Sequence, residues 1–214
     1  MTSKRPQITD LLIGHFDRAL KTLVPYSNHA SEQSPAEHVV EKKLNDQQIK
    51  LVAGLMRVNH TGEVCAQGLY QGQALTAKRS NLYESMEAAA DEEIDHLVWC
   101  ENRLAELNAK TSLLNPAWYC FSYAMGAIAG IIGDRHSLGF VAATEQQVCK
   151  HLEDHLEQIG DIDPKSRAII SRMLVDEARH ASLAISSGGK PFSEEAKKIM
   201  SKVAKIMTKS SFHV

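Results

Sequence analysis

The chain has 214 residues, of which 43% are hydrophobic and 23% are charged. These values are typical of one soluble globular domain and exclude collagen-like chains, coiled-coil rods, disulfide-rich miniproteins and wholly disordered chains. The formal net charge of −2 lacks the basic excess that non-specific nucleic-acid binding requires, so no nucleic-acid partner is expected.

The amino-terminal region is predicted to hold one amphipathic helix and a polar connector. In residues 8–24, apolar residues such as Phe16 and Leu20 recur at helical spacing. Residues 25–44 are mostly polar and contain no such pattern. We therefore divide the chain into residues 1–46, a helix with its connector, and residues 47–214, the main domain.

Targeting and cysteine usage both favour a reducing compartment. Lys4 and Arg5 are not followed by an apolar run, so a secretory signal peptide is not expected. Acidic residues soon after them, Asp10 and Asp17, argue against a mitochondrial presequence. The four cysteines are far apart and form no Cys-x-x-Cys pair, so we expect free thiols: Cys65, Cys100, Cys120 and Cys149.

Helical periodicity continues to the carboxyl end, and almost no window alternates with period two. The chain is therefore predicted to be all-α. The expected further helices cover about 45–78, 81–108, 136–160, 164–187 and 193–209, the last of them basic and amphipathic. The first of these contains Gly54, Gly62, Gly68 and Gly72, which weaken a helix and so suggest close backbone packing or a site that needs room.

Residues 111–133 have no charged side chain, and 117–133 are largely apolar. One interpretation is a buried bundle helix with small residues at a helix crossing. The other is a membrane-inserted or membrane-facing helix, since Trp118, Tyr119 and Tyr123 gather at one end as at a membrane interface. The length is borderline for a membrane span, and we expect peripheral association instead.

Two copies of Glu-x-x-His, at Glu93–His96 and Glu177–His180, fall within predicted helices. Residues three positions apart lie on one face of a helix, so each copy points a carboxylate and an imidazole at the same place. One copy would be weak evidence, because chance Glu–His surface pairs are common. An acidic residue precedes each copy, and these two, Glu92 and Asp176, are candidates to hydrogen-bond the histidines.

A bundle that holds two metal ions needs one more glutamate from each of the other two helices. Glu63 and Glu145 stand among apolar and small residues, one helix before each Glu-x-x-His copy. The gaps from these glutamates to Glu93 and Glu177 are 30 and 32 residues, which indicates two similar helical hairpins. Four carboxylates and two imidazoles suit iron or manganese, and they lack the thiolates of structural zinc.

The sequence resembles the demethoxyubiquinone hydroxylase family of ubiquinone biosynthesis over roughly residues 47–214. The segments that carry the resemblance are Arg57-Val-Asn-His-Thr-Gly-Glu63, Glu92-Glu93-Ile-Asp-His96, Ala143-Thr-Glu145 with His151, and Asp176-Glu177-Ala-Arg-His180. The resemblance implies a ferritin-like four-helix bundle with extra hydrophobic and carboxyl-terminal helices. It also implies that Glu63, Glu93, His96, Glu145, Glu177 and His180 bind two iron ions, which Glu93 and Glu177 bridge, and that His151 lies near the site.

The resemblance further implies a monooxygenase, a 3-demethoxyubiquinol 3-hydroxylase, that acts on a polyprenylated benzoquinol with O₂. Its electrons would come from outside the chain, from NADH, a reductase or the quinol itself. No dinucleotide-binding Gly-x-Gly-x-x-Gly motif follows a strand, so a bound nicotinamide domain is not expected. No catalytic residue beyond the iron ligands is expected. We expect a peripheral protein on the cytoplasmic face of a bacterial inner membrane, alone, as a homo-oligomer or within a biosynthetic complex.

Three alternatives use a similar site: an iron-storage protein, a di-iron hydroxylase of tRNA and a manganese catalase. The apolar segment argues against a soluble storage cage. The net charge argues against a tRNA substrate. A catalase would not need a channel for a hydrophobic substrate.

Overall fold

The structure is a computed structural model that describes residues 8–78 and 80–214. This described part contains seven helices and no strand, which confirms the all-α prediction. The helices are α1 Ile8–Leu23, α2 Asp46–Thr76, α3 Ser80–Glu106, α4 Asn115–Ile132, α5 Asp134–Ile159, α6 Pro164–Ser186 and α7 Glu194–His213. Residues 1–7, which include the positive charges weighed for a signal peptide, lie outside the described residues.

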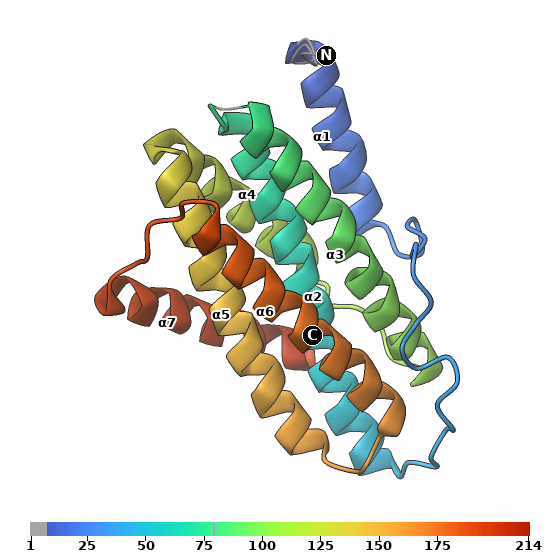
Figure 1. Cartoon of the computed structure of the whole chain (residues 1–214). Coiled ribbons are helices and arrows are strands. Elements are labelled where there is room, and N and C mark those ends of the chain that lie inside the picture. Colours follow the sequence, from blue (N-terminus) through green and yellow to red (C-terminus); the bar gives the residue numbers. More distant parts are fainter. Residues whose placement is uncertain (1–7, 79) are drawn as a thin grey trace.

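Helices α2, α3, α5 and α6 form the predicted four-helix bundle (Figure 1). Two hairpins, α2–α3 and α5–α6, pack together through α3 against α6 and α2 against α5. Apolar side chains from all four helices fill one end of the bundle, and they include Val52, Met56, Trp99, Leu152, Ile170 and Met173. Because each helix buries one face against the others, polar residues that share this face are carried into the core as well.

Local sequence signals set the beginnings of two bundle helices. Asn45 caps α2 by accepting a hydrogen bond from the Gln48 backbone N–H, while the Gln48 side chain accepts from the Asn45 backbone. Asp163 caps α6 by accepting from the backbone of Lys165. Both caps satisfy backbone donors that the first helical turn leaves free.

Helix α4 lies along α2 outside the bundle, and glycines on both helices permit the contact. A side chain at Gly72 would overlap the Tyr123 carbonyl oxygen, and one at Gly126 would overlap the Leu69 carbonyl oxygen. The backbone packing predicted from the glycines of residues 45–78 is therefore confirmed at Gly72. The buried-helix interpretation of residues 111–133 holds for one face of α4, where Tyr119 is buried.

The outer face of α4 carries exposed apolar side chains: Phe121, Ile128, Ile131 and Ile132. Helix α1 packs beside α4, where His15 and Tyr123 make an edge-to-face ring contact, and it exposes Ile13, Phe16 and Leu20. Among residues 8–78 and 80–214, none of the helices has both the length and the apolar character needed to cross a membrane.

The polar connector between α1 and α2 is tied to the bundle. The backbone N–H of Ser31 donates to Asp95 on α3 at 2.6 Å, and the Trp99 indole donates to the Glu32 carbonyl at 3.3 Å. Further along, Glu41 pairs with the buried guanidinium of Arg103 at 3.0 Å. The connector therefore covers the part of α3 that carries His96, the histidine of the first Glu-x-x-His copy. All four cysteines are free, as predicted.

Candidate metal centre

Helices α3 and α6 bring the two Glu-x-x-His copies face to face inside the bundle. The Glu93 carboxylate lies between both histidines: its Oε1 is 2.9 Å from His180 Nδ1 and its Oε2 is 3.0 Å from His96 Nδ1. Glu177 makes the same pair of contacts, at 3.1 Å to His96 Nδ1 and 3.3 Å to His180 Nδ1. Two buried carboxylates thus each span two imidazoles.

The two remaining predicted glutamates reach the same place from α2 and α5. Ligand atoms of Glu63, Glu93, His96 and Glu177 all lie within 4.8 Å of one another. Glu145 is also buried, and its Oε1 accepts a hydrogen bond from the Tyr70 hydroxyl at 2.9 Å. Glu145 and His180 lie outside the tightest group of four, so the six residues share one buried region without equal spacing.

The electrostatics of this region favour a bound cation. Burial raises the pKa of Glu63 well above its usual range, and the charges of Glu93 and Glu177 raise it further. Burial likewise raises the pKa of Glu145, with Glu177 and Glu93 adding to the effect. Buried like charges at this density are costly without compensating positive charge. Oxygen and imidazole donors in this number fit hard divalent cations, so the residues fit a metal pair.

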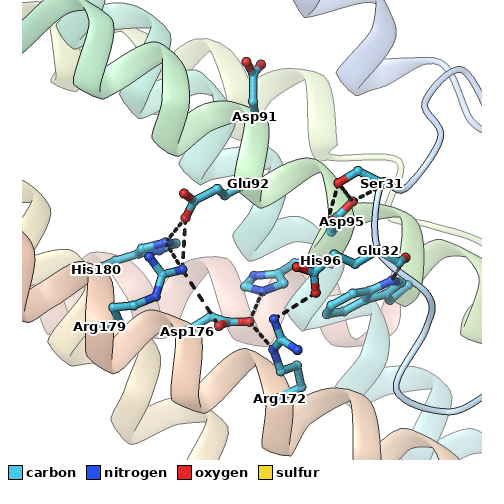
Figure 2. A pocket seen from close by; sticks show the side chains of 11 residues that line it. Ser31, Glu32, Asp91, Glu92, Asp95, His96, Arg172, Asp176, Arg179 and His180 are labelled. Carbon is cyan, nitrogen blue, oxygen red and sulfur yellow. Dashed lines mark hydrogen bonds and ion pairs between the residues drawn. The ribbon is translucent and has the colours of Figure 1, made fainter.

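The outward-facing nitrogens of the two histidines are held by the acidic residues that precede the motifs, and the pairing is crossed (Figure 2). His96 Nε2 lies 3.2 Å from Asp176 Oδ2, and His180 Nε2 lies 2.8 Å from Glu92 Oε2. The hydrogen bond from His96 is the largest cause that lowers the pKa of Asp176, to about 2. Each Nδ1 therefore points inward toward the carboxylates.

Sequence reasoning missed three residues that contact this group. Arg172 donates to Asp176 at 2.7 Å, and Arg179 donates to Glu92 at 3.0 Å. The spacing of four between Arg172 and Asp176 on one helix could have indicated the first pair. Tyr70, which donates to Glu145, gave no such signal because the two residues are 75 positions apart.

The predicted neighbour His151 lies on α5 beyond Glu145. Its ring packs against that of His155, with centroids 3.9 Å apart, and His155 Nδ1 is 2.8 Å from Asn59 Oδ1. The Nε2 atom of His151 is buried and has no hydrogen-bond partner among the described residues. A role of His151 near the metal centre stays a prediction.

A polar pocket of about 290 Å³ lies between α3 and α6 and opens onto both histidines (Figure 2). Its acidic lining comprises Glu32, Asp91, Glu92, Asp95 and Asp176, and its basic lining comprises Arg172 and Arg179. Trp99 and Ser31 complete the side that the connector covers. The pocket thus connects solvent with the outward faces of the imidazoles.

Comparison with known proteins agrees with this geometry. The family model "Ubiquinone biosynthesis protein COQ7" matches residues 50–211, which is most of the chain. The chain belongs to the COQ7 family. This result confirms the resemblance found from the sequence motifs, and the matched residues include all six predicted ligands.

Several COQ7-type relatives match over nearly their whole length, and each is named 3-demethoxyubiquinol 3-hydroxylase, a hydroxylating oxidoreductase. The protein from Pseudomonas syringae pv. syringae (strain B728a) is 54% identical over 213 residues, covering 100% of this chain and 99% of the relative. The protein from Pseudomonas savastanoi pv. phaseolicola (strain 1448A / Race 6) is 55% identical over 205 residues, covering 96% and 95%. The protein from Azotobacter vinelandii (strain DJ / ATCC BAA-1303) is 54% identical over 206 residues, covering 96% of both.

Proposed function

We propose that this chain hydroxylates the ring of a polyprenylated demethoxy-benzoquinol in ubiquinone biosynthesis, using two iron ions, O₂ and an external reductant. The observation that carries the proposal is the crossed pair of Glu-x-x-His motifs, which meets two further buried glutamates inside the bundle. The names of the relatives supply the substrate class, 3-demethoxyubiquinol.

The six buried residues would hold the iron ions: Glu63, Glu93, His96, Glu145, Glu177 and His180. Glu93 and Glu177 each contact both imidazoles, so each of these carboxylates would lie beside both ions. When bound, a ferrous pair supplies the reduction of O₂ and the transfer of one oxygen atom to the ring, while the other leaves as water.

The contribution of the chain itself is to fix the ligands and to keep the centre dry. Asp176 and Glu92 accept hydrogen bonds from the Nε2 atoms, which fixes the tautomer and leaves each Nδ1 free to bind a metal. Buried apolar residues, among them Val64, Leu97 and Tyr119, pack close to this level of the bundle and limit access of bulk water. We assign no catalytic residue beyond the ligands.

The polyprenyl tail of the substrate places the reaction at a bilayer. The exposed apolar side chains of α1 and α4 support peripheral association through these two helices. We propose the cytoplasmic face of a bacterial inner membrane as the location. Electrons would come from NADH or a reductase, and the chain would act by itself, as a homo-oligomer or in a biosynthetic complex.

The decisive experiment combines genetics with isotope labelling. Deleting the gene should make the host accumulate demethoxyubiquinone, and the intact gene should restore ubiquinone. Purified iron-loaded protein, given the quinol, a reductant and ¹⁸O₂, should add one ¹⁸O atom to the ring. Normal ubiquinone in the deletion strain, or label that comes from H₂¹⁸O instead, would overturn the proposal.

A further inference from the structure

We infer that the two ion positions are unequal: the position beside His96 binds tightly, and the position beside His180 is exchangeable and communicates with solvent through the pocket between α3 and α6. This inference rests on the metal pair of the proposed function. It adds the order in which the two ions bind and the route by which one of them exchanges with solvent. Neither the motifs nor the relatives indicate these.

The donor atoms are distributed unevenly between the two positions. His96 belongs to the group of four residues whose ligand atoms already lie within 4.8 Å of one another, together with Glu63, Glu93 and Glu177. The corresponding glutamate on the other side, Glu145, gives one oxygen to the Tyr70 hydroxyl. Because less rearrangement is needed where the donors already meet, a cation gains more by binding beside His96.

The carboxylates that hold the two imidazoles differ in exposure. The Asp176 side chain is 12% exposed, whereas the Glu92 side chain is 51% exposed. The contact of Glu92 with His180 is the shorter, at 2.8 Å, but solvent screens an exposed charge and a long side chain loses more conformational freedom when it is held. The orientation of His96 is therefore the more firmly fixed.

The His96 side is also covered by other groups. The Trp99 ring packs against the imidazole, with centroids 5.4 Å apart, and its indole N–H bonds the connector at Glu32. Ser31 of the connector is bonded to Asp95, which precedes His96. On the other side, His180 faces Glu92 and Arg179, which are both about half exposed and easily displaced.

The pocket has the charge expected of a cation route. Five carboxylate side chains line it against two guanidinium groups, and the histidines form its inner wall. A cleft whose lining carries mostly one sign of charge raises the local concentration of ions of the opposite charge. A divalent cation at the His180 position would lie on the Nδ1 side of the ring, so it would reach this pocket when the ring turns, and release of His180 Nε2 by Glu92 permits that turn.

The test is a titration of metal-free full-length protein with Mn²⁺, in which free Mn²⁺ is counted by electron paramagnetic resonance. Wild type should bind two ions in two steps. Two close cations repel each other, so two steps alone would not show that the positions differ. The assignment comes from variants: Glu92→Gln should weaken only the second step, and Asp176→Asn should weaken the first, each by about 10- to 100-fold.

If the positions were equivalent, both variants would spare the first step, because the intact position would simply fill first. That result for Asp176→Asn would overturn the inference, as would an effect of Glu92→Gln on the first step. Asp91→Asn is the matched control, since it removes a carboxylate from the same pocket but contacts neither histidine (Figure 2). It should change both steps by less than about threefold.

Two further measurements keep the outcomes distinct. If Asp176→Asn does not fold, Arg172→Gln removes the exposed donor that holds the same carboxylate and should weaken the first step in the same direction. Removal of iron from the loaded protein by a chelator should show one fast and one slow ion, and Glu92→Gln should accelerate only the fast one. Failure of wild type to bind any ion would contradict the proposed metal pair itself, whereas two unaffected steps would contradict only this inference.

Discussion

His180 and Glu92 belong to different Glu-x-x-His motifs, yet His180 Nε2 lies 2.8 Å from Glu92 Oε2. The reverse pair, His96 with Asp176, makes the same connection in the opposite direction. Each motif therefore supplies the acidic residue that orients the histidine of the other. A slide of α3 along α6 by one helical turn, about 5.4 Å, would break both pairs, so this crossed arrangement fixes the register of the two hairpins.

Glu93→Gln should remove the metal while leaving the fold intact. Glu93 is the carboxylate that approaches both inward-facing imidazole nitrogens most closely, and the amide keeps the shape of the side chain but not its charge. We expect the iron content to fall from two ions per chain to less than one, with loss of ring hydroxylation. Metal analysis and circular dichroism on the same preparation measure both effects.

The control for that variant is Glu84→Gln, an exposed glutamate on the same helix. It should keep full iron content. Retention of both ions by Glu93→Gln would contradict a role of this carboxylate as a shared ligand.

The sequence predicted the bundle and the two Glu-x-x-His pairs because both depend on helical spacing, whereas Glu63 and Glu145 were predicted from their apolar surroundings and from the family resemblance. Residues three apart share a helix face, so Glu93 with His96 and Glu177 with His180 had to point together. The crossed partners could not be predicted in the same way. Glu92 and Asp176 each stand beside their own motif, and only the packing of α3 against α6 shows which histidine each one reaches.

The connector shows a different limit of sequence reasoning. Its polar composition predicted a segment without regular structure, but not that Glu41 would pair with Arg103, a fully buried arginine that also bonds Asp163 at the start of α6. Contacts between residues about 60 positions apart leave no periodic signal. The choice between core helix and membrane-facing helix for residues 111–133 was similarly open, because α4 buries one face and exposes apolar residues on the other.

Gly72→Ala should destabilise the protein, because the new methyl group would overlap the Tyr123 carbonyl oxygen where α4 lies against α2. Overpacking of this kind costs about 1–3 kcal/mol. Gly62→Ala on the same helix meets no atom within 4 Å and should stabilise it by up to about 1 kcal/mol, from helix propensity alone. Thermal unfolding of the two variants should therefore shift in opposite directions. Equal shifts would mean that the α2–α4 contact is not as close as described.

His155 should make unfolding of the metal-free protein easier as the pH falls below about 6.5, the usual pKa of histidine. Burial, with the neighbouring His151, lowers the pKa of His155 to about 3. Between these two pKa values the unfolded chain binds a proton at His155 that the folded chain does not bind. This contribution to stability is therefore lost as the pH falls. At pH 5 this single group should contribute about 2 kcal/mol of lost stability relative to neutral pH.

His155→Gln tests the assignment, because glutamine can still donate to Asn59 but does not titrate. The difference in unfolding free energy between pH 7.5 and pH 5 should shrink by about the same 2 kcal/mol in this variant. An unaltered pH profile in His155→Gln would show that His155 can be protonated in the folded state.

Replacing both Ile13 and Phe16 with serine should weaken binding to phospholipid vesicles. These side chains are 68% and 67% exposed on α1, so their removal costs little folding stability. Burying one such side chain in an apolar phase contributes about 1.5–3 kcal/mol, so the double variant should bind vesicles at least about tenfold more weakly in a flotation assay. Val40→Ser is the matched control, because Val40 is 84% exposed but lies on the connector, and it should bind as wild type does. If the double variant floated like wild type, contact with the bilayer through these two side chains of α1 would be contradicted, because their exposed apolar area is the feature from which that contact is inferred.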